Sequence, residues 1–246
     1  MKMENCMYRE VCTDECSKVC KRYGVTKFML QASNIPQSKW GINKLVPEPC
    51  DEEAFGKLAE IRNKITDFVK NGQNLYLYSN VCGNGKTTWS IKLMLQYFND
   101  IWEGNGFTER GVFMPVSEFL YRCKAEISKP SEEFIALRER MFNIDLVIWD
   151  DIACGKMSDY DFNMLLAFID HRVVNGKANI FNGNIPPEKL DEYVGNKLAS
   201  RINSGYHIEL KMCINASTST YNQTVFDSYV NLLRSQTEAM SAALGG

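Results

Sequence analysis

The sequence lacks any long hydrophobic run, and this absence limits where the chain can act. No segment of the 246 residues contains the roughly 18 consecutive apolar residues that a membrane-spanning helix requires. The N-terminal sequence MKMENCMYREVC has no apolar stretch of the kind found in secretory signals. We therefore expect a cytoplasmic protein that has no membrane partner.

The sequence also has little net charge and few histidines. The formal net charge is −2, which excludes a strong bulk attraction to nucleic acid but allows a local basic patch. Neither His171 nor His207 lies in a nucleophile pattern, so the sequence does not support a hydrolytic triad. Hydrophobic residues make up 45% and charged residues 24% of the chain, which is typical of one globular domain with a small appendage.

Cysteine is the residue type with an unusual distribution. The count of nine is odd, and without a signal sequence we expect reduced thiols rather than disulfides. Four cysteines lie close to the N-terminus, at Cys6, Cys12, Cys16 and Cys20. Four thiolates can complete a tetrahedral zinc site. An unbroken helix over 12–20 would separate its end residues by about 12 Å along the axis, which is too far for one ion.

Either the backbone breaks near residues 13–17 or one of these cysteines is not a ligand. A zinc site, an iron–sulfur cluster and plain thiols therefore remain as alternatives.

Hydrophobic periodicity divides the rest of the chain into alternating strands and helices. Strands are expected at 75–78, 111–116, 144–149, 179–181 and 206–213, with helices between them. Strands that alternate with helices predict an α/β fold, with a five-stranded parallel sheet and helices on both faces.

The first of these strands leads directly into a glycine-rich sequence, NVCGNGKTT, which is followed by an apolar helix. This arrangement matches a P-loop, in which backbone N–H groups and a helix N-terminus surround nucleotide phosphates. Lys86 is expected to reach the β- and γ-phosphates, and Thr87 to bind Mg²⁺. Asn80 replaces the first glycine, and we expect it to be tolerated because Asn adopts left-handed backbone angles readily. The predicted cofactor-binding residues, for ATP with Mg²⁺, are Asn80, Gly83, Asn84, Gly85, Lys86, Thr87, Thr88 and Asp150.

Two adjacent carboxylates, Asp150 and Asp151, follow the apolar run 146–149. A P-loop needs a second group to hold Mg²⁺, and the end of a neighbouring strand supplies it. Asp150 is expected to hold the Mg²⁺ shell, and Asp151 to act as the general base on the attacking water. The pair predicts nucleotide hydrolysis, and the alternative is that it only caps the following turn.

These motifs, with the segments NIFNGN at 179–184 and LASRI at 198–202, resemble AAA+ ATPases of the DnaC/DnaI helicase-loader type. The transposition helper IstB belongs to the same group. The resemblance implies a P-loop NTPase with an AAA+ ATPase domain over 51–215. A Cys-rich, zinc-binding module that engages the helicase is then expected over 1–24, a linker over 25–50, and a C-terminal helix and tail over 216–246. The whole pattern, including the Cys-rich N-terminus, is most similar to loaders of Gram-positive bacteria and their phages, so the expected location is a bacterial or host cytoplasm.

The resemblance also implies roles for two residues. Asn184 looks like sensor 1, which contacts the γ-phosphate or the water, and Asn182 is the competing candidate. Arg201 resembles an arginine finger, which reaches the ATP of a neighbouring subunit. Too few residues follow Cys213 for the helical lid of most AAA+ proteins. We therefore expect a partner subunit to complete the site in an ATP-dependent oligomer.

Loaders of this type contact single-stranded DNA, and the candidates here are Arg122, Lys124 and Lys129, interleaved with Phe119 and Tyr121. The alternative is that Phe119 belongs to the core and the basic residues form a solvated face. The expected function is ATP-dependent loading of a hexameric replicative DNA helicase onto single-stranded DNA during replication initiation. The alternatives are an IstB-type transposition helper and a small nucleotide or nucleoside kinase, whose arginine-rich lid would use Arg122, Arg138 and Arg140.

Overall fold

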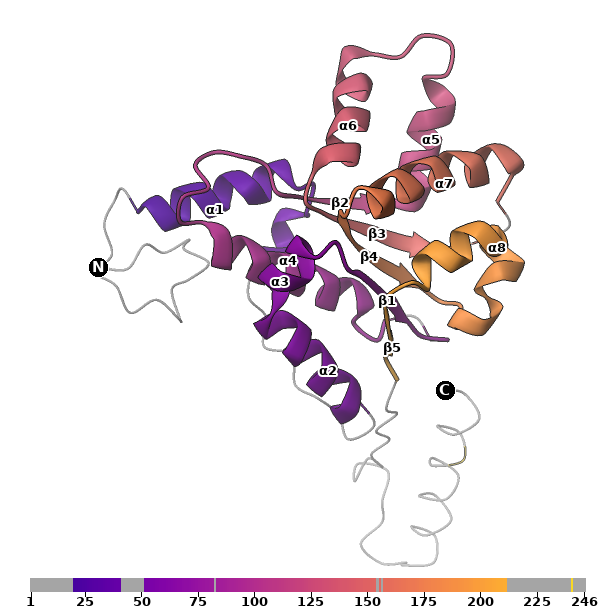
Figure 1. Cartoon of the computed structure of the whole chain (residues 1–246), viewed down its shortest axis with the longest axis horizontal. Helices are drawn as coiled ribbons and strands as arrows, with labels where there is room; N and C mark the ends of the chain where they lie inside the picture. The colour runs from indigo at the N-terminus through magenta and orange to yellow at the C-terminus, as the bar shows by residue number, and fades with distance from the viewer. Residues whose placement is uncertain are drawn as a thin grey trace, which may run out of the picture.

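The computed structural model describes residues 20–211, apart from 41–50, 82, 154 and 156, together with Met240. Five parallel strands form one sheet in the order β2-β3-β4-β1-β5 (Figure 1). The strands are β1 (Asn74–Tyr78), β2 (Gly111–Pro115), β3 (Leu146–Ile152), β4 (Ala178–Gly183) and β5 (Tyr206–Glu209). The predicted five-stranded parallel sheet is confirmed.

Helices cover both faces of this sheet, as predicted (Figure 1). One face carries α1 (Lys21–Ala32), α2 (Glu52–Asn63), α3 (Ile65–Lys70) and α4 (Lys86–Ile101). The other carries α5 (Val116–Ala125), α6 (Glu132–Asn143), α7 (Asp159–Val174) and α8 (Leu190–Ile202). Two short 3-10 helices, η1 (Gln37–Lys39) and η2 (Pro187–Lys189), lie in connections. The layers enclose two hydrophobic cores.

The central strands supply apolar side chains to both cores. In β1, Leu75 and Leu77 pack into one core, whereas Tyr76 packs into the other. In β3, Ile148 and Trp149 likewise face opposite sides. Burial on both faces explains why these strands are almost continuously apolar in sequence.

The strand order brings the segments that follow β1, β3 and β4 to the same end of the sheet, because these three strands are neighbours. From β1 the chain passes through α4 to β2 at the far edge, and then returns through β3 to β4 beside β1. Because all strands are parallel, their carboxyl ends meet at the same edge. In sheets of this kind, ligands bind outside the carboxyl ends of the strands.

The prediction of a linker over 25–50 is wrong for residues 25–32, which belong to α1. Within α1, Met29 and Leu30 are buried against the layer that contains α4. The chain after α1 then contacts the sheet edge, where the Phe113 N–H donates to the Ser33 carbonyl at 2.7 Å. The apolar residues of α1 lack a clear helical period, so its burial depends on tertiary contacts that the sequence pattern does not show. Residues 41–50 lie outside the described part.

A buried arginine fixes the opposite, amino end of the sheet. Arg172 of α7 is fully buried, and its guanidinium donates to Asn179 Oδ1 at 2.7 Å. It also donates to the carbonyls of Ile144 at 2.9 Å and Ala178 at 2.6 Å. Burial lowers the pKa of Arg172, and the charge of nearby Asp145 offsets only part of this effect. The hydrogen bonds to oxygen acceptors allow the guanidinium to remain charged inside the core.

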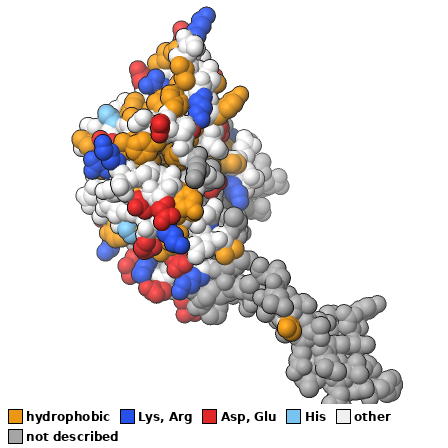
Figure 2. All heavy atoms as spheres, turned by 90° about the vertical axis from the view of Figure 1, so that its right-hand side faces the viewer, with side chains coloured by type: hydrophobic (Ala, Val, Ile, Leu, Met, Phe, Trp, Pro, Cys, Tyr) orange, Lys and Arg blue, Asp and Glu red, His pale blue; other side chains and the backbone are white. Residues whose placement is uncertain are grey.

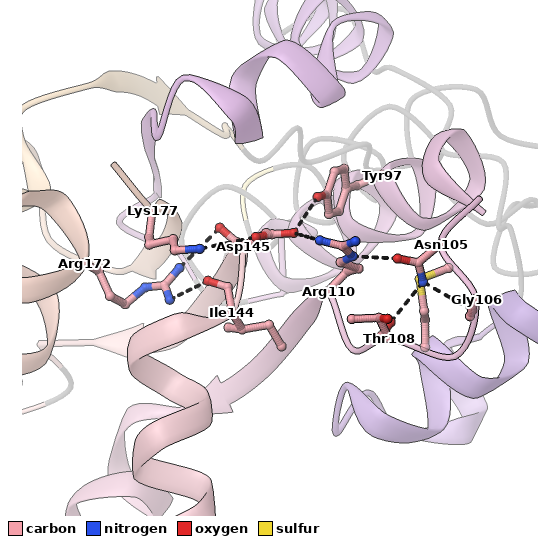
Figure 3. Close-up of polar contacts among 10 residues, drawn as sticks. Tyr97, Asn105, Gly106, Thr108, Arg110, Ile144, Asp145, Arg172 and Lys177 are labelled. Atoms are coloured by element: carbon pink, nitrogen blue, oxygen red, sulfur yellow. Dashed lines mark hydrogen bonds and ion pairs between the residues drawn. The ribbon is translucent and has the colours of Figure 1, made fainter. Parts of the chain in front are cut away.

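Asp145, directly before β3, extends this network (Figure 3). Its carboxylate pairs with Arg110 at 3.0 Å and Lys177 at 3.4 Å, and accepts a hydrogen bond from the Tyr97 hydroxyl at 3.1 Å. Burial and the neighbouring Asp145 charge both raise the pKa of Tyr97, so the phenol stays protonated and donates. The network joins α4, α7 and the start of β3, so it holds both helices to the amino end of the sheet.

Candidate functional site

The glycine-rich loop joins β1 to α4 at the carboxyl edge of the sheet, as predicted. Gly83 and Gly85 have φ values of 85° and 90°, which are left-handed angles that side chains disfavour. Gly85 is the N-cap of α4, so the unpaired N–H groups of the first helical turn lie at this edge. Asn80 has no positive φ. Asn therefore fits at this position for a different reason from the one predicted, because no left-handed conformation is required there.

Lys86 is held over the loop by hydrogen bonds to other residues of the loop. Lys86 Nζ donates to the Val81 carbonyl and to Asn84 Oδ1, both at 3.1 Å. The Asn84 amide donates in turn to the Leu210 carbonyl at 2.6 Å, which ties the loop to the chain after β5. A lysine ammonium so placed can exchange these neutral acceptors for phosphate oxygens, which bind it more strongly. Thr88, the last predicted loop residue, lies in the first turn of α4.

Thr87 and Asp150, the two predicted Mg²⁺ residues, are in contact. The Thr87 hydroxyl on α4 donates to Asp150 Oδ1 on β3 at 2.9 Å. A hydroxyl and a carboxylate are hard oxygen ligands, which suit Mg²⁺. Among the described residues, no cluster of three or more His, Cys, Asp or Glu side chains could hold a metal alone. The pair therefore fits an ion that keeps water and phosphate oxygens as its other ligands, as Mg²⁺ does.

A β-bulge presents the second carboxylate. The pairing of β3 with β4 shifts register between Trp149 and Ile152, and Asp151 is exposed while its neighbour Ile152 is buried. Asp151 and Ala153 have φ values of 60° and 67°. Asp tolerates the left-handed region, whereas Ala has no side-chain compensation there. Strain of this kind concentrates at functional sites.

The substitution Ala153→Gly is expected to raise the free energy of unfolding by about 1 kcal/mol. Glycine adopts the left-handed angle freely, and this gain exceeds the added entropy of the unfolded chain. Denaturant unfolding of the purified variant measures the change. As a matched control, Ala136→Gly at an exposed position of α6 should lower stability by a similar amount. Equal losses in both variants would contradict the assignment of strain to residue 153.

The end of β4 brings two asparagines to this edge, and each contacts a different carboxylate. Asn184 lies just beyond the strand, and its amide donates to Asp151 Oδ1 at 3.4 Å. Asn182 is 1% exposed, and its amide donates to Asp150 Oδ1 at 2.5 Å and to Ser90 Oγ at 2.8 Å. Asn184 thus lies beside the predicted general base, where a sensor residue is needed. The sequence interpretation missed Ser90, whose only signal is a hydroxyl one helical turn after Thr87.

Gly183, between the two asparagines, is required by close packing. A Cβ at this position would lie 2.4 Å from Tyr76 Oη, whose hydroxyl donates to the Ile185 carbonyl at 2.6 Å. No side chain fits there, so Asn182 and Asn184 are held on either side of a tightly packed backbone.

Arg201 lies on α8, and its side chain contacts neither the described residues of the P-loop nor Asp150 and Asp151. Its guanidinium pairs with Asp170 of α7 at 2.6 Å, with both side chains nearly half exposed. Gly195, at φ 73° and ψ 154°, kinks α8 before the segment that carries Arg201. A groove of about 530 Å³ follows this segment, lined by Leu166, Asp170, Asn196, Lys197, Ser200 and Arg201. The guanidinium of Arg201 is therefore at the surface, beside this groove.

The predicted DNA residues are engaged in ion pairs. Arg122 pairs with Glu118 and Lys124 with Asp161, each at 2.8 Å. Burial alone would raise the pKa of Asp161, but hydrogen bonds from Lys124 and Ser158 outweigh this effect and lower it. Figure 2, which shows the molecule from the right-hand side of Figure 1, has Lys and Arg side chains scattered among acidic and hydrophobic ones over the described part of that view.

The aromatic residues interleaved with this pair divide between the core and the surface. Phe119 is fully buried, which confirms the core interpretation of that residue. Tyr121 is 73% exposed.

The predicted zinc residues Cys6, Cys12 and Cys16 lie outside the described residues. Cys20 is the N-cap of α1, where its sulfur accepts the Tyr23 N–H at 3.5 Å.

No helix within the described ranges is long and apolar enough to cross a membrane.

No family model matches the sequence. A short stretch of 31 residues is 68% identical to the methylmalonyl-CoA mutase small subunit of Porphyromonas gingivalis, covering 13% of this chain and 5% of that protein. The chain thus spans about one-twentieth of this curated relative. A match of that length carries no argument about the site.

Solved structures are similar over most of the described chain. The DnaC helicase loader is 15% identical with a TM-score of 0.58, covering 72% of this chain and 100% of that one. DnaI is 14% identical with a TM-score of 0.58, covering 73% and 96%. The chain has an AAA+ fold. A third structure with this fold is the replication initiator DnaA bound to AMPPCP and single-stranded DNA. It is 16% identical with a TM-score of 0.55, covering 82% of this chain and 62% of that one. At such identities the likeness establishes the AAA+ fold alone.

Proposed function

We propose that this AAA+ protein is an ATP-dependent loader that delivers a hexameric replicative DNA helicase to single-stranded DNA. The observation that carries the proposal is the match to the whole solved chain of the DnaC helicase loader. The contacts of Thr87 with Asp150 and of Asn184 with Asp151 at the carboxyl end of the sheet support it. DnaI, similar over 96% of its chain, supports the same assignment.

Each residue at the carboxyl edge has a distinct task in this function. Lys86 and the N-terminus of α4 bind the β- and γ-phosphates, which they stabilise by charge and N–H donation. Thr87 and Asp150 hold Mg²⁺, which neutralises charge that develops on the phosphates. Asp151 accepts the proton of the attacking water. Asn184, in contact with Asp151, orients that water or the γ-phosphate.

Arg201 completes the site of a neighbouring subunit in an ATP-dependent oligomer. It lies on the surface of α8 and its partner Asp170 is exposed, so exchanging that carboxylate for a phosphate costs little. A cation added at the γ-phosphate stabilises the transition state. Hydrolysis then depends on assembly.

In this proposal the surface of α5 contacts single-stranded DNA. The Cys-rich N-terminal segment contacts the helicase. Tyr121 offers an exposed ring for base stacking. Arg122 and Lys124 lie beside it and must exchange Glu118 and Asp161 for phosphate. Cys6, Cys12, Cys16 and Cys20 are the proposed Zn²⁺ ligands. Zinc analysis of the purified protein tests that part of the proposal.

The kinase alternative has less support than the loader. Its arginine-rich lid would use Arg122, Arg138 and Arg140, but Arg122 pairs with Glu118 and Arg140 pairs with Glu109 at 3.3 Å. Arg138 lies over the Phe134 ring of its own helix. Arg122 and Arg140 line a groove of about 630 Å³ beside the end of β2, and no described residue of the P-loop lines this groove. The IstB-type helper shares the ATPase core and differs in the partner protein.

Capture of a replicative helicase tests the loader function. The tagged full-length chain is expected to retain a hexameric replicative helicase in the presence of ATP and Mg²⁺, and to deliver it to a single-stranded oligonucleotide. Lys86→Ala is the matched control, and it should lose the ATP dependence because the phosphates lose their cation. Retention of a transposase in place of the helicase would favour the IstB-type helper, and retention of neither would contradict the proposal.

A further inference from the structure

Asn182 occupies a position that differs from that of a residue sensing the nucleotide. It is 1% exposed inside the sheet, whereas Asn184 lies at the open end of the same strand. Both N–H bonds of the Asn182 amide are used within the protein, on Asp150 Oδ1 and Ser90 Oγ. A side chain with both donors engaged and almost no exposure cannot reach a phosphate or an attacking water.

The two acceptors of Asn182 lie on the two elements that form the predicted magnesium site: Ser90 on α4, which also carries Thr87, and Asp150 on β3. Ser90 lies one turn after Thr87 on α4, and its hydroxyl contacts the carbonyls of Lys86 at 3.0 Å and Thr87 at 3.2 Å. A single hydroxyl hydrogen cannot satisfy both carbonyls fully, so these are alternative acceptors. Asn182 therefore lies between the P-loop helix and the carboxylate of Asp150.

One oxygen of Asp150 receives both hydrogen bonds. Oδ1 accepts the Thr87 hydroxyl at 2.9 Å and the Asn182 amide at 2.5 Å. Within the described part of the chain, Asp150 Oδ2 has no hydrogen bond. Two donors on Oδ1 fix the rotation of the carboxylate and leave Oδ2 for a ligand shell.

We propose that Asn182 is a positioning residue that orients Asp150 toward Mg²⁺ and couples this carboxylate to the P-loop helix through Ser90. The inference rests on the proposed ATP function, and it separates the roles of the two asparagines. Asn184 faces the nucleotide, and Asn182 acts through Asp150. Groups that orient a metal ligand from behind typically change metal affinity about 10- to 100-fold when removed.

A purely structural role for Asn182 makes a different prediction. The carbonyl oxygen of Asn182 is buried and has no partner among the described residues. Leucine has a similar volume and removes this unsatisfied atom together with both donors, so Asn182→Leu is expected to fold. If Asn182 only supported the fold, its loss would lower the melting temperature without changing the dependence on Mg²⁺.

The experiment measures binding of a fluorescent ATP analogue to the full-length chain, first in EDTA and then over a Mg²⁺ titration. For Asn182→Leu, the Mg²⁺ midpoint is expected to rise about tenfold while metal-free binding stays within about twofold. Ser90→Ala should shift the midpoint in the same direction by about threefold, because Asn182 keeps its bond to Asp150. Thermal melts of each variant are recorded alongside.

Asn105→Leu is the matched control, because it removes a buried amide that lies beyond the far end of α4 and contacts the Thr108 carbonyl and Arg110. Its Mg²⁺ midpoint should match that of the wild type. An unchanged or lowered midpoint in both Asn182→Leu and Ser90→Ala would overturn the inference, as would an equal shift in Asn105→Leu. If Asn182→Leu does not fold, Ser90→Ala decides the question. Failure of the wild type to bind the analogue would instead contradict the ATP function itself.

Discussion

Asp151→Asn is expected to reduce ATP hydrolysis about 10²- to 10⁴-fold while ATP binding stays within about twofold, because the variant loses the general base. The amide has the same shape as the carboxylate but cannot accept the proton of the attacking water. Asparagine also tolerates the φ of 60° at this position, so the backbone of the bulge should not change. Phosphate release and binding of a fluorescent ATP analogue measure the two effects separately.

Asp150→Asn provides the matched comparison, since the two residues are adjacent but contact different partners. Asp150 contacts Thr87 and Asn182, so its loss should weaken Mg²⁺-dependent binding as well as hydrolysis. Identical profiles for the two variants would contradict the division of roles. Hydrolysis within tenfold of the wild type in Asp151→Asn would exclude this residue as the base.

Arg201→Ala is expected to reduce hydrolysis about 10³-fold or more in the assembled state, with ATP binding by each subunit preserved. The arginine acts on the nucleotide of a neighbour, so its loss and the loss of Lys86 should complement each other. A mixture of Arg201→Ala and Lys86→Ala subunits therefore forms some intact composite sites. We expect the mixture to hydrolyse ATP faster than either variant alone, at a rate that rises with total protein concentration.

Asp170→Asn separates this role from simple surface pairing. Removing the partner of Arg201 frees the guanidinium and costs at most about 1 kcal/mol of stability, because the ion pair is nearly half exposed. Hydrolysis by Asp170→Asn should match or exceed that of the wild type. Loss of activity in Asp170→Asn equal to that in Arg201→Ala, or no gain on mixing, would contradict action in trans.

The strands and the P-loop were predictable because their signals are local. Residues 75–78 and 146–149 are apolar runs of strand length, and the glycines and Lys86 follow in a fixed order. The pairing of Thr87 with Asp150 was also predictable, since the carboxyl ends of parallel strands meet at one edge.

Other features depend on contacts between distant segments. The burial of α1 requires α4 and the sheet edge, and its own sequence carries little helical periodicity. The ion pair of Lys124 depends on where α7 packs, because its partner Asp161 lies on that helix. Arg122 instead pairs with Glu118 four residues earlier in α5, a local spacing that the sequence interpretation did not use. Asn182 contacts Asp150 and Asn184 contacts Asp151 because of the register between β3 and β4. The motif NGN alone does not show which asparagine faces which carboxylate.

The hydrogen bond from Phe113 to Ser33 also restricts how copies of this chain can associate. An exposed edge strand invites a strand from another molecule to extend the sheet, which is the usual route to uncontrolled aggregation. At β2, the segment after α1 occupies one such bonding position, and Pro115 has no N–H to offer at the end of the strand. Both features disfavour β-augmentation along β2, so a second copy of the chain that approaches this side meets an edge strand with fewer free N–H donors.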